Sequence, residues 1–379
     1  MFFDIYQRVV IYMKRANNII INRILVNYWK RKNRYFIFNI DKSEKIQNKI
    51  LLRILNENRD SKYLIDRDIE EILKESDLDT IVAKYQETIP IVNYEDLLQS
   101  IEEEKKGNCG TLTSKKNRIK LFELTSGSTS SEKYIPYTKK MLEEYMDGVF
   151  VWLYDLYINH KELYKGTSYW SISPVLKREL KTSAGISVGI EDDTSYFNKS
   201  IGKLLNRIFA VPKELKYVDD MEDFILLTVV FLLLSENLTI ISIWSPSFLN
   251  VLLDYIENNN FKILELIENE ELSGLYFEDK KLEKKYYFQK IKKMYRKKRT
   301  NERVRYLRSC LLEKHINYSN IWKNLNMVSC WGDSDSEEFY LKLKLRLPKI
   351  NFQMKGLMST ECIVSIPITS RNVKHMLQD

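Results

Sequence analysis

The stretch FELTSGSTSSEKYIPYT, residues 122–138, decides how the rest of the chain is interpreted. Its first residues complete a short apolar segment, Leu121 to Leu124, and its last residues form YIPYT at 134–138. Both segments have the length and composition of β-strands. The sequence therefore predicts two strands joined by the polar loop TSGSTSSEK, residues 125–133.

The loop 125–133 combines small residues, hydroxyl groups and a lysine. Small side chains let backbone N–H groups turn toward an anion, and hydroxyl groups add further donors. Charge-assisted hydrogen bonds of this kind contribute about 1.5–3 kcal/mol each, so phosphate is the ligand that suits the loop. It lacks the Lys-Ser/Thr pair of a P-loop, and a polar hairpin turn is the alternative interpretation. The phosphate-binding candidates are Thr125, Ser126, Gly127, Ser128, Thr129 and Lys133.

A second candidate segment is GLMSTE, residues 356–361, which lies between two short apolar segments. A glutamate at a strand end beside a threonine can hold Mg²⁺ and contact a phosphate. Thr360 and Glu361 are therefore candidate catalytic residues, and Glu361 is the candidate metal ligand. The alternative is a Thr-Glu pair on an ordinary surface.

A third candidate segment is VSCWGD, residues 328–333, where an apolar strand ends in a glycine and an acid. A glycine at such a turn lets a flat base lie against the backbone. Trp331, Gly332 and Asp333 are therefore candidates for a turn that packs against a flat base. An ordinary strand-to-helix turn is the alternative interpretation.

The segments around these motifs predict an α/β fold. Residues 1 to about 105 have the apolar spacing of helices, and Lys139 to Tyr157 fits an amphipathic helix with Thr138 as its N-cap. The segments 169–174 and 238–246 are predicted to be buried strands, and helices then alternate with strands up to residue 368. We expect mixed β-sheets covered by helices, with a helical segment at 1–108 and a core at 109–379.

Bulk composition is that of a globular protein with 44% hydrophobic and 30% charged residues. The net charge of +8 fits nucleic acid, an anionic membrane surface or an anionic substrate equally well. The apolar run Phe224 to Leu234 is too short to cross a bilayer and is predicted to be a buried helix. The scattered cysteines and the absence of a signal-peptide pattern favour a cytoplasmic protein without a membrane partner.

A basic segment at 280–308 has aromatic residues spaced through it. It is either a nucleic-acid patch or a solvated helix with some of its apolar residues turned inward. We favour the solvated helix, because charge runs usually mark exposed faces. The inward residues would be Tyr286, Phe288, Ile291 and Tyr295.

The three candidate segments follow one another as a Ser/Thr/Gly loop, a strand that ends in Gly-acid and a Gly-x-x-x-Thr-Glu segment. In this order they resemble the motifs of the acyl-adenylating enzyme superfamily. Within it, the chain resembles the auxin-responsive Gretchen Hagen acyl acid–amido synthetases and their bacterial relatives, from about residue 89 to 368. The resemblance implies the large N-terminal domain of an acyl-adenylating enzyme. The similar segments are YEDLLQSIEEEKKG (94–107), FELTSGSTSSEKYIPYT (122–138), YWSISP (169–174), AGISVGIEDDTSYF (184–197), VSCWGDSDSEEFY (328–340) and GLMSTECIVSIPI (356–368).

The resemblance also implies substrates and roles. ATP and Mg²⁺ would be the cofactors, and a small carboxylic acid and an amino acid the substrates. Residues 126–129 would hold the β- and γ-phosphates, the turn at 331–333 would face the adenine, Thr360 would contact the α-phosphate and Glu361 would bind Mg²⁺. No residue of the acyl pocket is identified.

The chain also departs from the family pattern. Ser130, Ser131 and Cys362 stand where glycine or proline is common, and the chain stops before the family's Gly-Asp element and small C-terminal domain. We therefore expect a truncated member that binds ATP weakly and does not complete amide synthesis by itself. A second polypeptide that supplies the missing part is a further expected partner. The competing hypotheses are a non-catalytic remnant that keeps the fold and, less favoured, a basic nucleic-acid-binding protein.

Overall fold

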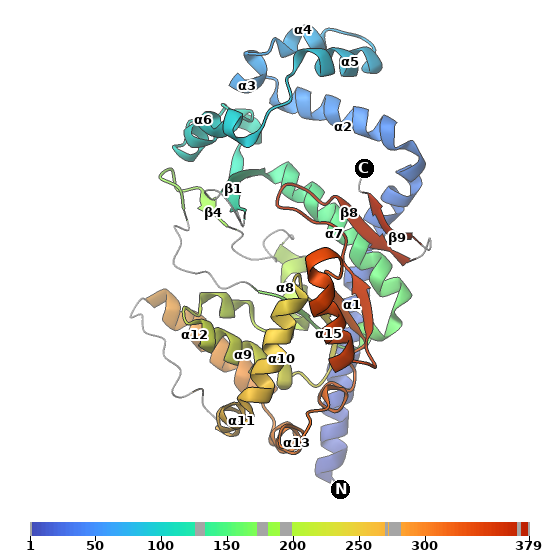
Figure 1. The fold of residues 1–379 in the computed structure, drawn as a ribbon, viewed down its shortest axis with the longest axis vertical. Helices are drawn as coiled ribbons and strands as arrows, with labels where there is room; N and C mark the ends of the chain where they lie inside the picture. The colour runs from blue at the N-terminus through green and yellow to red at the C-terminus, as the bar shows by residue number, and fades with distance from the viewer. Residues whose placement is uncertain are drawn as a thin grey trace.

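A computed structural model gives the fold of the chain. It describes residues 2–125, 133–172, 181–189, 199–269, 272, 282–369 and 373–377. Its amino-terminal part is helical, as expected. In Figure 1 the first helix begins at the lower end of the molecule, and the helices that follow it form the upper end. The helices of this part are α1 (Phe2–Asn39), α2 (Ser43–Asn58), α3 (Lys62–Ile65), α4 (Ile69–Leu73), α5 (Leu78–Thr88) and α6 (Tyr94–Lys105). The first of them packs into a core of the main body through Ile21, Leu25, Val26 and Trp29. The predicted boundary near residue 108 stays a prediction.

A four-stranded parallel sheet forms the centre of the main body. Its strand order is β3-β5-β6-β7, and every neighbouring pair runs parallel. All four carboxyl ends therefore meet at one edge. The strands are β3 (Thr167–Trp170), β5 (Leu238–Ser242), β6 (Met327–Cys330) and β7 (Asn351–Met354).

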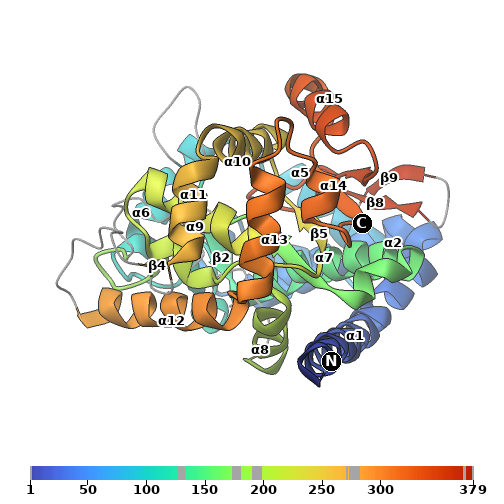
Figure 2. The ribbon, with the colours of Figure 1, turned by 90° about the horizontal axis from the view of Figure 1, so that it is seen from below.

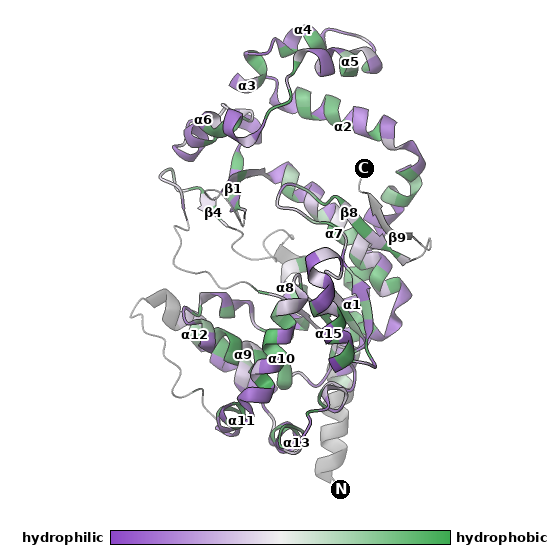
Figure 3. Cartoon of the chain, in the orientation of Figure 1, coloured by the Kyte–Doolittle hydropathy of each residue, from purple (hydrophilic) through white to green (hydrophobic). Residues whose placement is uncertain are grey.

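Helices cover both faces of this sheet. Successive side chains of a strand point to opposite faces, so neighbouring residues pack against different helices. Ile240 and Met327 pack with α1, α7 (Lys139–Asn159) and α8 (Lys199–Ile208). The next residue of each strand, Ile241 and Val328, packs on the other face. That face is covered by α9 (Met221–Leu233), α10 (Pro246–Asn258), α11 (Asn260–Glu268) and α13 (Asn301–Leu311). Helix α9 is apolar and buried, as its sequence predicts, and Figure 3 shows this hydropathy.

Two smaller sheets lie above the parallel one in the view of Figure 1. The first has the order β2-β1-β4, from β1 (Ile119–Leu124), β2 (Tyr134–Thr138) and β4 (Ser187–Val188). The second pairs β8 (Ser365–Ile368) with β9 (Val373–Leu377) in an antiparallel hairpin. The strand at 134–138 and the N-cap of the following helix are confirmed, because the Thr138 side chain accepts a hydrogen bond from the Met141 amide at 3.2 Å.

The basic segment is two helices rather than one. It divides into α12 (Leu282–Lys298) and α13, because the Thr300 side chain caps the second helix. Ile291 and Tyr295 are buried, as predicted, but Tyr286 is 55% exposed, and that prediction is wrong. The neighbouring Tyr287 packs instead, with its ring stacked 4.0 Å from that of Tyr217.

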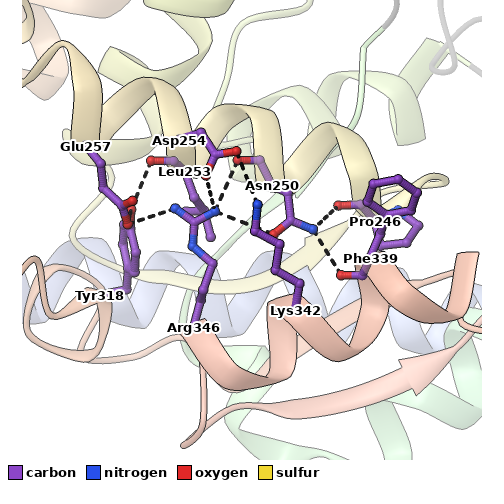
Figure 4. A network of polar contacts seen from close by, with 9 residues as sticks. All are labelled: Pro246, Asn250, Leu253, Asp254, Glu257, Tyr318, Phe339, Lys342 and Arg346. Atoms are coloured by element: carbon purple, nitrogen blue, oxygen red, sulfur yellow. Dashed lines mark hydrogen bonds and ion pairs between the residues drawn. The ribbon is translucent and has the colours of Figure 1, made fainter.

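Helix α15 (Glu337–Arg346), which follows the candidate adenine turn, is tied to α10 by a polar network. Figure 4 shows the Arg346 guanidinium between two carboxylates of α10, at 2.6 Å from Asp254 and 2.8 Å from Glu257. The Tyr318 hydroxyl donates to Glu257 at 2.9 Å, and Asn250 donates to the Phe339 carbonyl at 3.0 Å. These contacts hold the start and the end of α15 on α10.

We expect Arg346→Met to lower the free energy of unfolding by about 1.5–3 kcal/mol, because hydrogen bonds to charged groups are lost while part of the methylene chain is kept. Urea denaturation measures the change. The matched control is Arg308→Met, which breaks an exposed pair with Glu268 and should cost less than about 1 kcal/mol. Equal effects of the two substitutions would contradict this view of the network.

Candidate functional site

Three loops leave the carboxyl-terminal edge of the parallel sheet side by side. The pairing of the strands continues beyond their ends, because the Trp331 amide donates to the Trp244 carbonyl and the Lys355 amide to the Cys330 carbonyl, both at 2.9 Å. In open α/β sheets, ligands bind at this edge. The candidate segments 328–333 and 356–361 are thereby placed at a single location.

The candidate adenine turn is closely packed. The Trp331 ring lies 5.7 Å from the Trp244 ring. Gly332 is buried, and a β-carbon there would lie 2.9 Å from the Met354 side chain. Asp333 follows on the surface and is exposed. The turn therefore presents a tryptophan, a backbone without a side chain and a carboxylate in succession.

The GLMSTE segment turns back on itself. A β-carbon at Gly356 would lie 1.9 Å from the carbonyl oxygen of Ser365, so only glycine fits here. The Ser359 hydroxyl accepts hydrogen bonds from the amides of Glu361 and Cys362, each at 3.2 Å. This tight turn leaves Thr360 half-buried and Glu361 exposed at its tip.

Tyr137 of β2 joins this turn to the first hairpin. Its hydroxyl donates a hydrogen bond to the Thr360 carbonyl, although 223 residues separate the two in sequence. Burial raises the pKa of the Tyr137 hydroxyl, and Tyr145 and the carboxylates of Glu123 and Glu361 raise it further. The predicted catalytic pair therefore lies beside the strands that flank the predicted phosphate loop.

Most of the phosphate loop falls outside the described residues: Ser126, Gly127, Ser128 and Thr129, with 130–132. Its two ends are described. The Thr125 amide donates to the Lys133 carbonyl at 3.1 Å, which closes the hairpin. The Lys133 ammonium lies 3.7 Å from Glu95 and 5.1 Å from the centre of the Tyr94 ring, both on α6. This lysine is more than a third exposed, so the ion pair is weak and leaves it able to reorient.

Lys355 is a residue of this edge that the sequence did not single out. Its side chain is 5% exposed and donates to the Ser242 hydroxyl at 2.8 Å. The ammonium also lies over two indole rings, 4.6 Å from Trp152 and 4.4 Å from Trp244. The hydroxyl and the two ring faces offset part of the cost of burying this ammonium. In the sequence, a single lysine before GLMSTE is indistinguishable from the many surface lysines.

Comparisons with known proteins agree with this architecture. The profile of the GH3 family N-terminal domain matches residues 37–351. Indole-3-acetic acid-amido synthetase GH3.2 from Arabidopsis thaliana is 30% identical over 150 residues, which is 38% of this chain and 24% of that protein. The chain thus spans about a quarter of this curated relative.

Solved structures show the same fold. The chain is similar to GH3.15 acyl acid amido synthetase with a TM-score of 0.65 and 17% identity, over 87% of this chain and 55% of that one. The structure of AtGH3.15 acyl acid amido synthetase in complex with 2,4-DB gives a TM-score of 0.69 and 18% identity, over 86% and 54%. The chain thus spans about half of these solved chains.

The two glycines of the edge make a test of the packing. We expect Gly356→Ala to cost about 3 kcal/mol or more, because its new methyl group would meet backbone atoms of β8. Gly332→Ala should cost about 1–2 kcal/mol, because the atoms that it meets belong to side chains that can shift. Thermal and urea unfolding measure both, and a harmless Gly356→Ala would show that the turn is packed differently.

Proposed function

The chain belongs to the GH3 family, and we propose on that premise that it binds ATP with Mg²⁺ at the edge described above and activates a small carboxylic acid. The product of this step is an acyl-adenylate, and in the complete family an amino acid amine then forms the amide. The observation that carries the proposal is the contact between Tyr137 and Thr360, which brings the Thr-Glu turn to the hairpin of the phosphate loop.

Each part of the site has a role in the proposal. The loop 126–129 with Thr125 and Lys133 would donate to the β- and γ-phosphates. Thr360 would donate to the α-phosphate, and the turn at Trp331-Gly332-Asp333 would face the adenine. The buried positive charge of Lys355 supports an anionic ligand at this edge, because it lowers the electrostatic free energy of phosphates and carboxylates nearby.

The residues also fit a bound magnesium ion. Mg²⁺ is commonly held by one or two carboxylates together with substrate phosphates, rather than by a complete protein cage. Glu361 offers such a carboxylate at the exposed tip of the turn, next to the half-buried Thr360. The ion would neutralise charge on the phosphates, while Glu361 would hold it in place.

The proposed chemistry is an in-line transfer. An oxygen of the substrate carboxylate attacks the α-phosphorus of ATP, and the bond to the β-phosphate oxygen breaks to release pyrophosphate. In the second step of the complete family, the amine nitrogen attacks the acyl carbon, loses a proton to solvent and displaces AMP. The task of the protein is to orient the two reactants and to stabilise the charge of the leaving pyrophosphate.

Calorimetric titration with ATP and Mg²⁺ tests the proposed site. We expect the unmodified chain to bind and the double variant Ser128→Ala, Glu361→Gln to bind at least about tenfold more weakly, since each substitution removes a group that contacts phosphate or metal. Chelation of Mg²⁺ should weaken ATP binding to the unmodified chain but have little further effect on the double variant. Glu302→Gln, an exposed glutamate on α13, is the matched control and should bind as the unmodified chain does.

Two further assays separate the steps of the reaction. Pyrophosphate exchange that depends on an added acid reports adenylate formation, and conjugate formation reports the second step. A well-folded chain that does not bind ATP would favour a non-catalytic remnant. Nucleic-acid binding that falls steeply with added salt, without ATP binding, would favour a basic nucleic-acid-binding protein.

A further inference from the structure

Helix α1 has two apolar faces, of which one is buried and the other is largely exposed. Ile21, Leu25, Val26 and Trp29 are buried in the core that α1 shares with α7. A second set of apolar side chains is 40–71% exposed. Their spacings of three, four and seven residues place them on one side of the helix, as a stripe about 37 Å long. This exposed stripe consists of Met13, Ile20, Ile24, Tyr28, Tyr35 and Phe38.

The same helix is strongly basic. Between Met13 and Asn39 it has no acidic residue, and its basic residues are Lys14, Arg15, Arg23, Lys30, Arg31, Lys32 and Arg34. The arginines at 15, 23, 31 and 34 are exposed. At about 100° per residue, Arg23 and Arg34 fall along one border of the exposed stripe and Arg31 falls within it. An apolar stripe bordered by arginines is the pattern of helices that lie in a membrane interface.

Two neighbouring helices, α8 and α12, add basic residues beside those of α1. Figure 2 shows α12, α8 and α1 along one side of the molecule, and a cavity of about 570 Å³ is lined by all three. Asn17 lies between Met13 and Ile20 on the exposed side of α1 and also lines this cavity. Arg207 of α8 and Lys297 of α12 are exposed at the cavity. The cavity includes residues at the amino-terminal edge of the parallel sheet, so the surface lies away from the candidate adenylation site.

We propose that this face of α1, α8 and α12 docks on an anionic lipid bilayer, with the exposed stripe of α1 inserted at the level of the headgroups. Apolar insertion and attraction of basic residues to anionic lipids act together in such binding. A second copy of the chain fits less well, because two α1 helices would bring like charges together. A nucleic acid would use the arginines but leave the apolar stripe in water. Within the described residues no helix is long and apolar enough to cross a bilayer, so the helix would lie in the interface.

Vesicle cosedimentation tests this proposal with the full chain. We expect binding to vesicles of phosphatidylcholine with phosphatidylserine, little binding to phosphatidylcholine alone, and weaker binding as salt is added. Ile20→Ser with Ile24→Ser should weaken binding at least about tenfold, because the inserted apolar surface is lost. Arg31→Gln with Arg34→Gln should weaken it by about 25-fold, at about fivefold for each basic residue at an anionic surface.

Matched control variants lie on other surfaces. Phe261→Ser on α11 removes an apolar side chain that is 74% exposed, and Arg305→Gln with Lys314→Gln removes two exposed charges. These controls should bind vesicles as the unmodified chain does. Because every substituted residue is exposed, circular dichroism and the unfolding midpoint should not change. ATP binding should also be unchanged, so the result is independent of the proposed adenylation.

Three outcomes would overturn the proposal. The first is equal binding to both kinds of vesicle, or none to either. The second is a dimer by light scattering that Ile20→Ser with Ile24→Ser converts to a monomer, which would assign the stripe to a second copy. The third is tight binding of duplex or single-stranded nucleic acid that the arginine variants abolish and the isoleucine variants leave intact, without vesicle binding.

Discussion

The parallel pairing of β5, β6 and β7, and its continuation into the loops that follow, is the constraint on which the rest of the structure depends. The Trp331–Trp244 and Lys355–Cys330 backbone hydrogen bonds keep three loops in register beyond the ends of their strands. Without that register, Gly356 would not meet the backbone of β8, and the Thr-Glu turn would not reach Tyr137. Segments that lie far apart in sequence thus form one edge.

The sequence predicted well those features of the fold that depend on neighbouring residues. The hydroxyl of Thr138 caps α7, and the apolar run at 224–234 forms a buried helix, because both depend on residues within a few positions. Tyr286 was misjudged because its neighbour Tyr287 found the stacking partner, Tyr217, from a distant part of the chain. Such choices between adjacent side chains are made by tertiary contacts that no local pattern contains.

The candidate site was predictable in its motifs but not in its connections. Thr360 and Glu361 could be named from the sequence, whereas Tyr137 could not, since its contact spans 223 residues. Lys355 could not be recognised from the sequence for a similar reason. The two tryptophan rings that its ammonium contacts come from α7 and from the loop after β5. The sequence predicted that α1 is a helix but not that one apolar face is exposed. Residues of the buried and the exposed apolar faces alternate within one stretch of sequence, so neither face is distinguishable there.

The most direct test of the central claim is a crystal structure of this chain with Mg²⁺ and a non-hydrolysable ATP analogue. The account predicts that the adenine lies against the turn at 331–333, that the phosphates lie between the β1–β2 loop and Thr360, and that Glu361 contacts the metal ion. A nucleotide bound elsewhere, for example in the cavity between α1, α8 and α12, would contradict the assignment of this edge as the nucleotide site.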